Sequence, residues 1–244
     1  MSILYKKPES LNAVPFSFCP GCTHGLILKL AASVIDEMNL GGDAIAVGCV
    51  GCGGYMPWFM NIDTIYSLHG RAPANATGIK RMNPDKLVFT YQGDGDLASI
   101  GTAEIVHAAH RGEKFTTIFV NNTTYGMTGG QMAPTTLIGQ KTTTSPYGRD
   151  AAHCGKPIRV CEMLATIDGA AYIERVSVDS PANVRKAKKA IERAFRCQME
   201  GKGFSLIEVL STCPTNWGMT PLEALERIRT EMIPYFPLGN YRDW

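Results

Sequence analysis

The chain has 244 residues, of which 45% are hydrophobic and 19% charged, and its formal net charge is +2. This balance is typical of a folded globular protein, and a charge so near zero excludes the broad basic surface that binds nucleic acid. No apolar run approaches the roughly 20 residues that cross a bilayer, and the N-terminus lacks the apolar core of a secretory signal. We therefore expect no nucleic-acid partner, no membrane partner and a cytoplasmic location.

The first half of the chain alternates predicted helices and strands. Residues up to about 18 read as an irregular arm, and the Pro and Gly of Cys19-Pro-Gly-Cys22 predict a tight loop. The spacing of apolar residues predicts the elements that follow. They are a helix over 25–38, a strand over 43–47, a strand over 64–68, a helix over 76–82, a strand over 86–91 and a helix over 97–110.

The second half continues the alternation around one long loop. Residues 123–153 are rich in Thr, Gly and Pro, and a loop of such length is more often functional than a linker. The predicted elements are a strand over 115–120, a helix over 163–167, a strand over 171–178, a helix over 180–198, a strand over 204–210 and a helix over 221–232. Alternating strands and helices favour an α/β fold with a doubly wound, mostly parallel sheet.

Four turns with polar or sulfur side chains follow strand candidates, at Cys52, Asp94, Asn122 and Cys213. In doubly wound sheets, ligands bind beyond the carboxyl ends of the strands. We therefore expect these four turns to meet at one edge of the sheet.

The turn Gly93-Asp94-Gly95-Asp96 lies between a predicted strand and a predicted helix. Glycines at such a turn allow the backbone to approach a phosphate closely. Taken alone, the spacing also satisfies a dinucleotide fingerprint. However, two carboxylates would repel a bare pyrophosphate, and the motif lies in the middle of the chain. A bridging Mg²⁺, which prefers oxygen ligands and phosphates, removes the repulsion.

The next strand ends at Asn121-Asn122. One helix and one returning strand separate Asp94 from Asn122, so we expect their side chains at neighbouring strand ends. A carboxylate and an amide oxygen placed there can share one divalent cation. The alternative is that the first motif is a surface turn and the second an Asx turn, but the two motifs together favour the cation site.

Eight cysteines are more than packing requires, and in a reducing cytosol they favour metal, cluster or redox roles over disulfides. Two CxxC pairs stand out, Cys19 with Cys22 and Cys49 with Cys52. A four-cysteine zinc site, an iron–sulfur cluster and burial as small apolar side chains are the three uses to be weighed.

Several motifs together resemble the β subunits of the 2-oxoacid:ferredoxin oxidoreductases. The segment GDGDLASIGTAEIVHAAHRGEKFTTIFVNNTTYGMTGGQ is similar to their diphosphate-binding region, and CPGC, GCGG, HGRA and STCP stand at the places the family pattern gives them. The resemblance covers about residues 19–222. It implies a fold of the thiamine-diphosphate-binding (pyrophosphate-domain) type, with residues 1–244 as one domain that carries an N-terminal iron–sulfur loop and a C-terminal extension.

The resemblance also implies a set of cofactor ligands. Mg²⁺ would be bound by the side chains of Asp94 and Asn122 and by the Thr124 carbonyl. The backbone at Gly95 and Asp96 would contact the diphosphate. The other implied cofactor contacts are Gly93, Tyr125, Gly126, Met127, His69, Arg71 and Cys52.

Alternatives stay open for four of these residues. Tyr125 and Met127 could equally pack in the core. A His–Gly–Arg segment such as residues 69–71 is usually a surface turn, whereas Arg71 near the cofactor would help to neutralise diphosphate charge.

For a [4Fe–4S] cluster, which four thiolates normally hold, the resemblance implies Cys19, Cys22, Cys52 and Cys213. Cys49 stays open as an alternative to Cys52. The other cysteines are expected to be small buried apolar residues, namely Cys154, Cys161 and Cys197.

The enzyme that the resemblance implies decarboxylates a 2-oxoacid oxidatively to acyl-CoA and CO₂ and passes electrons through the cluster to ferredoxin. Its cofactors are thiamine diphosphate, Mg²⁺ and the [4Fe–4S] cluster, and its second substrate is coenzyme A. No catalytic residue is assigned to this chain, because in the family the glutamate that activates thiamine belongs to a partner subunit. An obligate hetero-oligomer with α/γ and ferredoxin-like δ subunits is therefore expected.

Family members that prefer 2-oxoglutarate often have Lys or Arg three residues after the third cluster cysteine, where this chain has Tyr55. Around it lie Met56, Trp58, Phe59 and Met60. These side chains favour a 2-oxoacid with an uncharged side chain, such as 2-oxoisovalerate, although the same set could form a partner interface. The alternatives are pyruvate or 2-oxoglutarate as substrate, a cluster-free decarboxylase or synthase subunit, and a non-enzymatic electron-transfer module.

Overall fold

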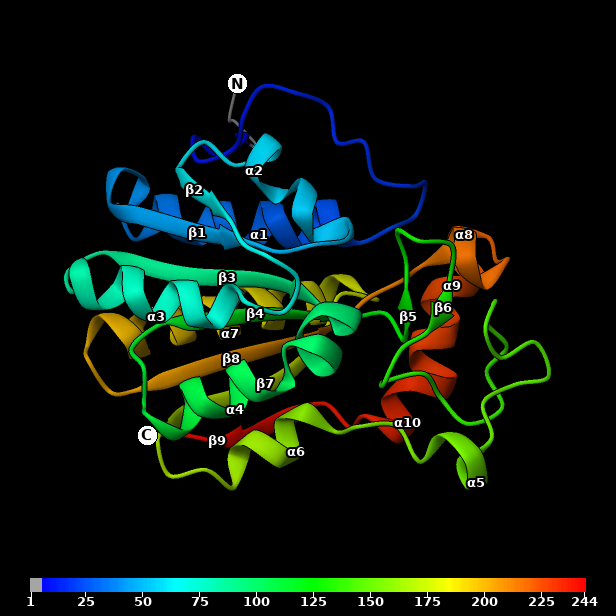
Figure 1. Ribbon diagram of the computed structural model, residues 1–244. Helices are drawn as coiled ribbons and strands as arrows, with labels where there is room; N and C mark the ends of the chain where they lie inside the picture. Colours follow the sequence, from blue (N-terminus) through cyan, green and yellow to red (C-terminus); the bar gives the residue numbers. More distant parts are fainter. Residues whose placement is uncertain (1–5) are drawn as a thin grey trace.

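The structure, a computed structural model, describes residues 6–244. Its centre is a seven-stranded sheet in the order β2-β1-β3-β4-β8-β7-β9, in which only β7 and β9 pair antiparallel. The strands are β1 (Ala44–Gly48), β2 (Asp63–Tyr66), β3 (Leu87–Gly93), β4 (Thr116–Asn121), β7 (Ala170–Ser177), β8 (Phe204–Leu210) and β9 (Gly239–Arg242). The predicted α/β fold with a mostly parallel sheet is confirmed (Figure 1).

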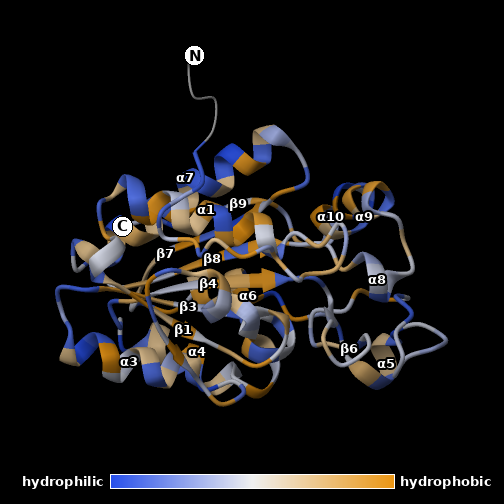
Figure 2. Cartoon of the chain, turned by 90° about the horizontal axis from the view of Figure 1, so that it is seen from above, coloured by the Kyte–Doolittle hydropathy of each residue, from blue (hydrophilic) through white to orange (hydrophobic). Residues whose placement is uncertain are grey.

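Helices cover both faces of this sheet. On one face α1 (His24–Glu37) packs beside α7 (Pro181–Met199), and on the other lie α3 (Ala72–Met82), α4 (Thr102–His110) and α6 (Val160–Ala165). Seen from above, the apolar strands lie between these two helical layers (Figure 2). The shorter helices are α2 (Met56–Phe59), α5 (Ala151–Cys154), α8 (Pro214–Trp217), α9 (Pro221–Arg227) and α10 (Ile233–Tyr235), with π-helical turns at Asp96–Ile100 and Ile228–Met232 and 3₁₀ turns at Gly41–Asp43 and Cys52–Tyr55.

Alternate side chains of the central strands fill a separate core on each face. On β4, Ile118 and Val120 join the core beneath α1 and α7, whereas Phe119 joins the core beneath α3, α4 and α6. Both β4 and β8 are buried along their whole length. Burial on both faces explains why these strands are rich in apolar residues instead of alternating with polar ones.

A third, smaller core attaches the C-terminal segment to the sheet. Leu210 at the end of β8 and Leu137 of the long loop pack against Ile228, Met232 and Phe236. The C-terminal helices α9 and α10 therefore stand beside the carboxyl ends of the strands (Figure 1).

Helix boundaries differ from the sequence prediction in several places. The helix predicted over 163–167 is α6, which begins at Val160 and ends at Ala165. α3 begins at Ala72, earlier than expected, because Pro73 occupies its first turn, where the missing proline N–H has no helical partner to lose. The helix predicted over 97–110 is a π-helical turn followed, after Gly101, by α4. The closing helix predicted over 221–232 likewise passes from α9 into a π-helical turn.

The sequence pattern does not predict β9 or the small ribbon inside the long loop. This ribbon pairs β5 (Thr124–Tyr125) with β6 (Gln131–Met132) in antiparallel register. Strands of two residues show no periodicity, and the sequence of β9, GNYR, is largely polar. In the part of the chain that the structure describes, no helix is long and apolar enough to cross a membrane.

Candidate functional site

The loops after β1, β3, β4 and β8 meet at one edge of the sheet (Figure 1). The strand order reverses between β1 and β3, because β1 leads to the outer strand β2 while β3 and β4 extend the sheet in the other direction. In such folds the ligand crevice lies at this reversal. The structure therefore brings together the four turns at Cys52, Asp94, Asn122 and Cys213, as the sequence predicts.

Asp94 occupies the turn directly after β3 and is 2% exposed. Its carboxylate accepts hydrogen bonds from the Gly95 N–H at 2.9 Å and from the Thr135 hydroxyl at 2.6 Å. The backbone N–H groups of Thr123 and Thr124 also favour its ionised form. The carboxylate therefore faces the turn at the end of β4.

The charge of Asp94 has no cationic partner among residues 6–244. Burial is the largest effect on this group and raises its pKa to about 7, despite the hydrogen bonds that it accepts. A buried carboxylate without a counter-charge is unfavourable. A divalent cation at this position would supply that counter-charge.

Asn121 and Asn122 end β4 in two successive Asx turns. Asn121 Oδ1 accepts from the Thr123 N–H at 3.1 Å, and Asn122 Oδ1 accepts from the Thr124 N–H at 3.2 Å. Thr123 has φ +59°, a left-handed conformation that a β-branched residue rarely adopts and that often marks a functional turn. The Asx geometry weighed from the sequence is therefore present, but at a buried position beside Asp94 rather than on the surface.

One cavity at this edge contains nearly all of the predicted cofactor contacts. Those that line it are Cys52, His69, Gly93, Asp94, Gly95, Asp96, Asn122, Thr124, Tyr125, Gly126 and Met127. Arg71 is the exception, because its guanidinium pairs with Glu104 at 2.6 Å and donates to the Ile100 carbonyl at 2.9 Å. In this structure Arg71 joins the start of α3 to α4. It does not line the cavity, so the predicted contact of Arg71 with the diphosphate is not supported here.

Two glycines shape the wall of this cavity. A Cβ on Gly95 would lie 2.4 Å from the Tyr125 ring, so the ring can pack on the turn only because residue 95 has no side chain. A Cβ on Gly93 would meet no atom within 4 Å. The open space over Gly93 is what a diphosphate needs to approach the backbone.

His69 and Asp96 join the loop after β2 to the turn after β3. His69 Nδ1 and Asp96 Oδ1 are 2.5 Å apart, and the Gly70 N–H donates to the same oxygen at 2.9 Å. Gln92 Nε2 donates to Asp96 Oδ2 at 2.6 Å. The Asp96 carboxylate is thus satisfied within the protein, which leaves its backbone as the group available to a ligand.

Hydrogen bonds hold the CPGC loop against the STCP turn that follows β8. Thr23 Oγ1 and Ser211 Oγ are 2.7 Å apart. Thr212 Oγ1 donates to the Gly21 carbonyl at 2.7 Å. Two motifs from opposite ends of the chain are therefore fixed side by side.

A second cavity adjoins the first and is lined by the four cysteines assigned to a cluster, Cys19, Cys22, Cys52 and Cys213. Gly126 belongs to the wall that both cavities share. A Cβ on Gly126 would lie 3.4 Å from the Cys52 Sγ and 3.5 Å from the Cys213 Sγ. Gly126 therefore lies directly beside two of the four sulfurs.

The thiols in this second cavity influence one another. Burial raises the pKa of Cys22 to about 12 and that of Cys52 to about 11, and charge on the neighbouring thiols adds to both shifts. Burial also raises the pKa of Cys213. Such thiols stay protonated until a cationic group replaces their protons.

Across residues 6–244, no three His, Cys, Asp or Glu side chains approach closely enough to hold a single metal ion.

The remaining cysteines differ in their surroundings. Cys49 is fully buried and lines neither cavity, in contrast to Cys52. Cys161 and Cys197 are buried, as expected. The expectation of a buried Cys154 is wrong, because this residue lies on the short surface helix α5 and is exposed.

His24 is a site residue to which the sequence assigns no role. It begins α1, is 1% exposed and lines both cavities, and its Nδ1 lies 2.7 Å from the Tyr91 hydroxyl. Burial lowers the pKa of His24 to about 4, so the ring is neutral near pH 7. Its place directly after the CPGC loop is the signal that could have identified it.

Thr135 and Asn216 are further site residues that the sequence does not single out. Thr135 reaches Asp94 from the long loop. The Asn216 Nδ2 donates to the Gly126 carbonyl at 2.7 Å and to the Cys213 Sγ at 3.2 Å. Both residues stand in loops or short turns without periodicity, so only their contacts in space reveal them.

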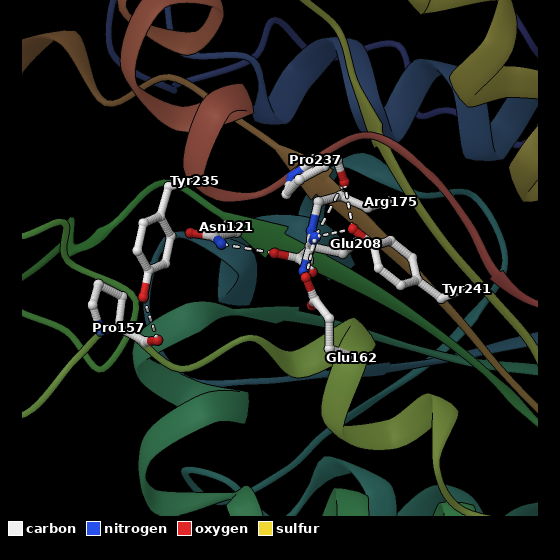
Figure 3. Close-up of polar contacts among 8 residues, drawn as sticks. All are labelled: Asn121, Pro157, Glu162, Arg175, Glu208, Tyr235, Pro237 and Tyr241. Atoms are coloured by element: carbon white, nitrogen blue, oxygen red, sulfur yellow. Dashed lines mark hydrogen bonds and ion pairs between the residues drawn. The ribbon is translucent and has the colours of Figure 1, made fainter.

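A buried polar network supports the end of β4 (Figure 3). Asn121 Nδ2 donates to Glu208 Oε1 at 2.8 Å, and Arg175 Nε donates to Glu208 Oε2 at 2.8 Å. Arg175 also pairs with Glu162 at 2.6 Å and donates to the Tyr241 hydroxyl at 2.5 Å. Because Asn121, Glu208 and Arg175 are all 0% exposed, the network fixes the direction of the Asn121 amide and, with it, the Asx turn beside Asp94.

Comparison with known families first gives the class of this fold. The thiamine pyrophosphate enzyme family, through its C-terminal TPP binding domain, matches residues 47–209. That range includes the loops after β1, β3 and β4 that line the first cavity. The fold is therefore that of a thiamine-pyrophosphate-binding domain.

Comparison with individual relatives identifies a family within this class. Ketoisovalerate oxidoreductase subunit VorA of Methanothermobacter thermautotrophicus is 44% identical over 98% of this chain and 52% of the relative. 2-Oxoglutarate synthase subunit KorB of Methanocaldococcus jannaschii is 41% identical over 85% of this chain and 73% of the relative. The solved 2-oxoglutarate:ferredoxin oxidoreductase from Magnetococcus marinus matches with a TM-score of 0.82 at 27% identity, over 99% of this chain and 86% of that chain.

The chain spans about half the length of the VorA relatives, which come from two Methanothermobacter species. It spans 73% of the KorB relative. The chain belongs to the 2-oxoacid:ferredoxin oxidoreductase family.

Proposed function

We propose that this chain is the thiamine-diphosphate- and [4Fe–4S]-binding subunit of an enzyme that converts a 2-oxoacid and coenzyme A to acyl-CoA and CO₂ and passes the electrons to ferredoxin. The observation that carries the proposal is the pair of adjoining cavities, one beside the buried Asp94 carboxylate and the other lined by four thiols. The matched relatives are named as subunits of ketoisovalerate oxidoreductase and 2-oxoglutarate synthase.

In the first cavity, the side chains of Asp94 and Asn122 and the Thr124 carbonyl would bind Mg²⁺. The diphosphate would lie against the backbone at Gly93 and Gly95. Two observations support this assignment, namely the buried carboxylate without a cationic partner and the open space over Gly93. When bound, thiamine diphosphate supplies the carbon nucleophile and the electron sink for loss of CO₂.

In the second cavity, Cys19, Cys22, Cys52 and Cys213 would hold the [4Fe–4S] cluster as thiolates. Two observations support this ligand set, namely the common cavity and the rise that neighbouring thiols add to the pKa of Cys22 and of Cys52. Because Gly126 lines both cavities, electrons would have only a short distance to travel between the two cofactors.

A partner subunit is needed to complete the site. No glutamate of residues 6–244 lines either cavity, so the group that activates thiamine would come from an α/γ subunit. Val50 and Met127 line the first cavity and are 43% and 45% exposed, and Leu68, the neighbour of the cavity residue His69, is 80% exposed. Such an apolar surface suits a partner. The proposed assembly is a cytoplasmic hetero-oligomer with α/γ and ferredoxin-like δ subunits, in which residues 1–244 form the thiamine-diphosphate domain.

For the substrate, we propose a 2-oxoacid with an uncharged side chain, such as 2-oxoisovalerate. Tyr55 lines the second cavity. The centre of its ring lies 5.2 Å from that of Trp58 and 6.2 Å from that of Phe18. This aromatic group offers no positive charge to the second carboxylate of 2-oxoglutarate. The 44% identity to a ketoisovalerate oxidoreductase subunit agrees with this choice.

The test is the turnover of 2-oxoisovalerate, pyruvate and 2-oxoglutarate by the assembled complex, measured as ferredoxin reduction that depends on coenzyme A. We expect 2-oxoisovalerate to give the highest kcat/KM. Tyr55→Lys should raise the relative kcat/KM for 2-oxoglutarate. A native preference for 2-oxoglutarate would defeat the substrate assignment, and the absence of activity with all three would defeat the proposed reaction.

A further inference from the structure

Asn216 lies at the point where the two cavities meet. It belongs to α8, directly after the turn that carries Cys213. Its Nδ2 donates to the Gly126 carbonyl at 2.7 Å and to the Cys213 Sγ at 3.2 Å. The same side chain therefore contacts a sulfur of the second cavity and the backbone of the wall between the cavities.

The orientation of the Asn216 amide follows from its partners. The Gly126 carbonyl can only accept a hydrogen bond, so the group that faces it must be the NH₂. An NH₂ group has two hydrogens and can serve the carbonyl and the sulfur together. The glycine at residue 130 leaves room for this side chain, because a Cβ there would lie 3.0 Å from the Asn216 Cβ.

A hydrogen bond to a cysteine sulfur changes the properties of a cluster that the sulfur binds. The N–H group withdraws electron density from the thiolate, which stabilises the reduced and more negative state of the cluster. Hydrogen bonds to sulfur are among the main influences on the potential of iron–sulfur clusters. Asn216 is the side chain within residues 6–244 that donates to one of the four assigned sulfurs.

We propose that Asn216 is a positioning residue that raises the reduction potential of the cluster through its hydrogen bond to Cys213. Its second hydrogen bond, to Gly126, links the cluster to the wall that both cavities share. The proposal rests on the proposed function, because it requires a cluster on Cys213. The proposal concerns a residue outside the predicted ligand sets, and it assigns to that residue an effect on the reduction potential of the cluster.

The experiment measures the midpoint potential of the cluster in the anaerobically purified complex, by a dithionite titration followed by electron paramagnetic resonance. Asn216→Leu removes the side-chain donor without adding charge and keeps the Asn216 backbone N–H that also bonds Cys213. It should shift the potential to a more negative value. Asn216→Asp has the same shape but replaces the donor with a carboxylate, and it should shift the potential further in the same direction. Asn216→Ser keeps a shorter donor and should fall between the wild type and Asn216→Leu.

Asn183→Leu is the matched control, because it removes a side-chain amide that donates to Asp179 at 2.8 Å, in α7 and outside both cavities. Its potential should equal that of the wild type. Iron and sulfide contents are measured for every variant. A wild-type complex without a cluster would overturn the proposed function itself.

A cluster of wild-type potential in Asn216→Leu and Asn216→Asp would overturn only the role of Asn216. If Asn216→Leu cannot hold a cluster, the difference in cluster potential between the wild type and Asn216→Asp decides whether Asn216 adjusts the potential. Loss of the cluster from both folded variants would show that Asn216 retains the cluster rather than adjusts its potential, and would also overturn the proposal.

Discussion

At the scale of single residues, Asp94 determines how the site responds to pH and to cations. Burial raises its pKa from 3.8 to about 7. The metal-free folded protein therefore holds a proton on Asp94 that the unfolded chain releases at lower pH. The stability that this proton contributes is fully present below about pH 4 and is lost as the pH rises through about 7.

Mg²⁺ should reverse this loss, because it binds the ionised carboxylate and stabilises the folded state by mass action. We expect Mg²⁺ with thiamine diphosphate to raise the melting temperature more at about pH 8 than at about pH 6. Thermal unfolding with and without the ligands measures this difference. Asp94→Asn should lose most of the response at both values, and a variant that responds like the wild type would rule out Asp94 as the cation ligand.

Gly93 and Gly78 provide a matched pair of glycine substitutions. A Cβ at either position meets no atom within 4 Å, but Gly93 lines the first cavity and Gly78 lies within the helix α3. Gly93→Ala should fold normally and weaken thiamine diphosphate binding at least about tenfold, which corresponds to about 1.4 kcal/mol. Gly78→Ala should leave binding unchanged and stabilise the chain by ~0.5–1 kcal/mol. Calorimetric titration measures the affinity of each variant for thiamine diphosphate. Equal affinities of the two variants would place the diphosphate elsewhere.

At the scale of elements, the regular strands and helices could be predicted from the sequence, because their apolar spacing is strong. The strand over 204–210 matches β8 residue for residue, and the turns at Asp94 and Asn122 were expected at strand ends. β9 and the β5–β6 ribbon could not be predicted, since they are short and depend on tertiary pairing.

The contacts of Asn216 and Thr135 depend on three-dimensional placement that one sequence does not encode locally. The pairing of Arg71 with Glu104 is a further example, because the residue before α3 and a residue of α4 meet only after folding. The sequence motif could assign Arg71 to the cofactor but could not reveal that Glu104 competes for its guanidinium.

The link between β8 and β4 leads to a prediction about Glu208. Glu208→Gln leaves either Asn121 or Arg175 facing an NH₂ group, and a buried donor without an acceptor costs about 1–3 kcal/mol. Because the Asx turn at Thr123 depends on the Asn121 amide, this variant should lower both the free energy of unfolding and the affinity for Mg²⁺ with thiamine diphosphate.

Glu162→Gln is the control for Glu208→Gln. Glu162 pairs with the same Arg175 but does not contact Asn121. Glu162→Gln should lower the free energy of unfolding without changing the affinity for Mg²⁺ with thiamine diphosphate. Equal losses of affinity in the two variants would mean that the network acts only on global stability, and wild-type affinity in Glu208→Gln would remove its role at the turn.

At the scale of the whole molecule, the proposed function makes the chain one part of a larger enzyme. It matches about half of the length of the VorA relatives, whereas 86% of the matched chain of the solved oxidoreductase structure is covered. The purified chain should therefore bind its cofactors but turn over no 2-oxoacid until the partner subunits are added. Turnover by the chain alone would contradict the placement of the activating glutamate on a partner.

The most direct test of the account is the iron, sulfide and thiamine content of the complex after anaerobic purification with its neighbouring subunits. We expect about four iron atoms and about four sulfides at the site of this chain, in addition to any clusters of the partners, together with about one thiamine diphosphate. Cys213→Ser should lose that iron, and Cys161→Ser should keep it. Full thiamine binding with unchanged iron in Cys213→Ser, or zinc in place of iron, would contradict the account.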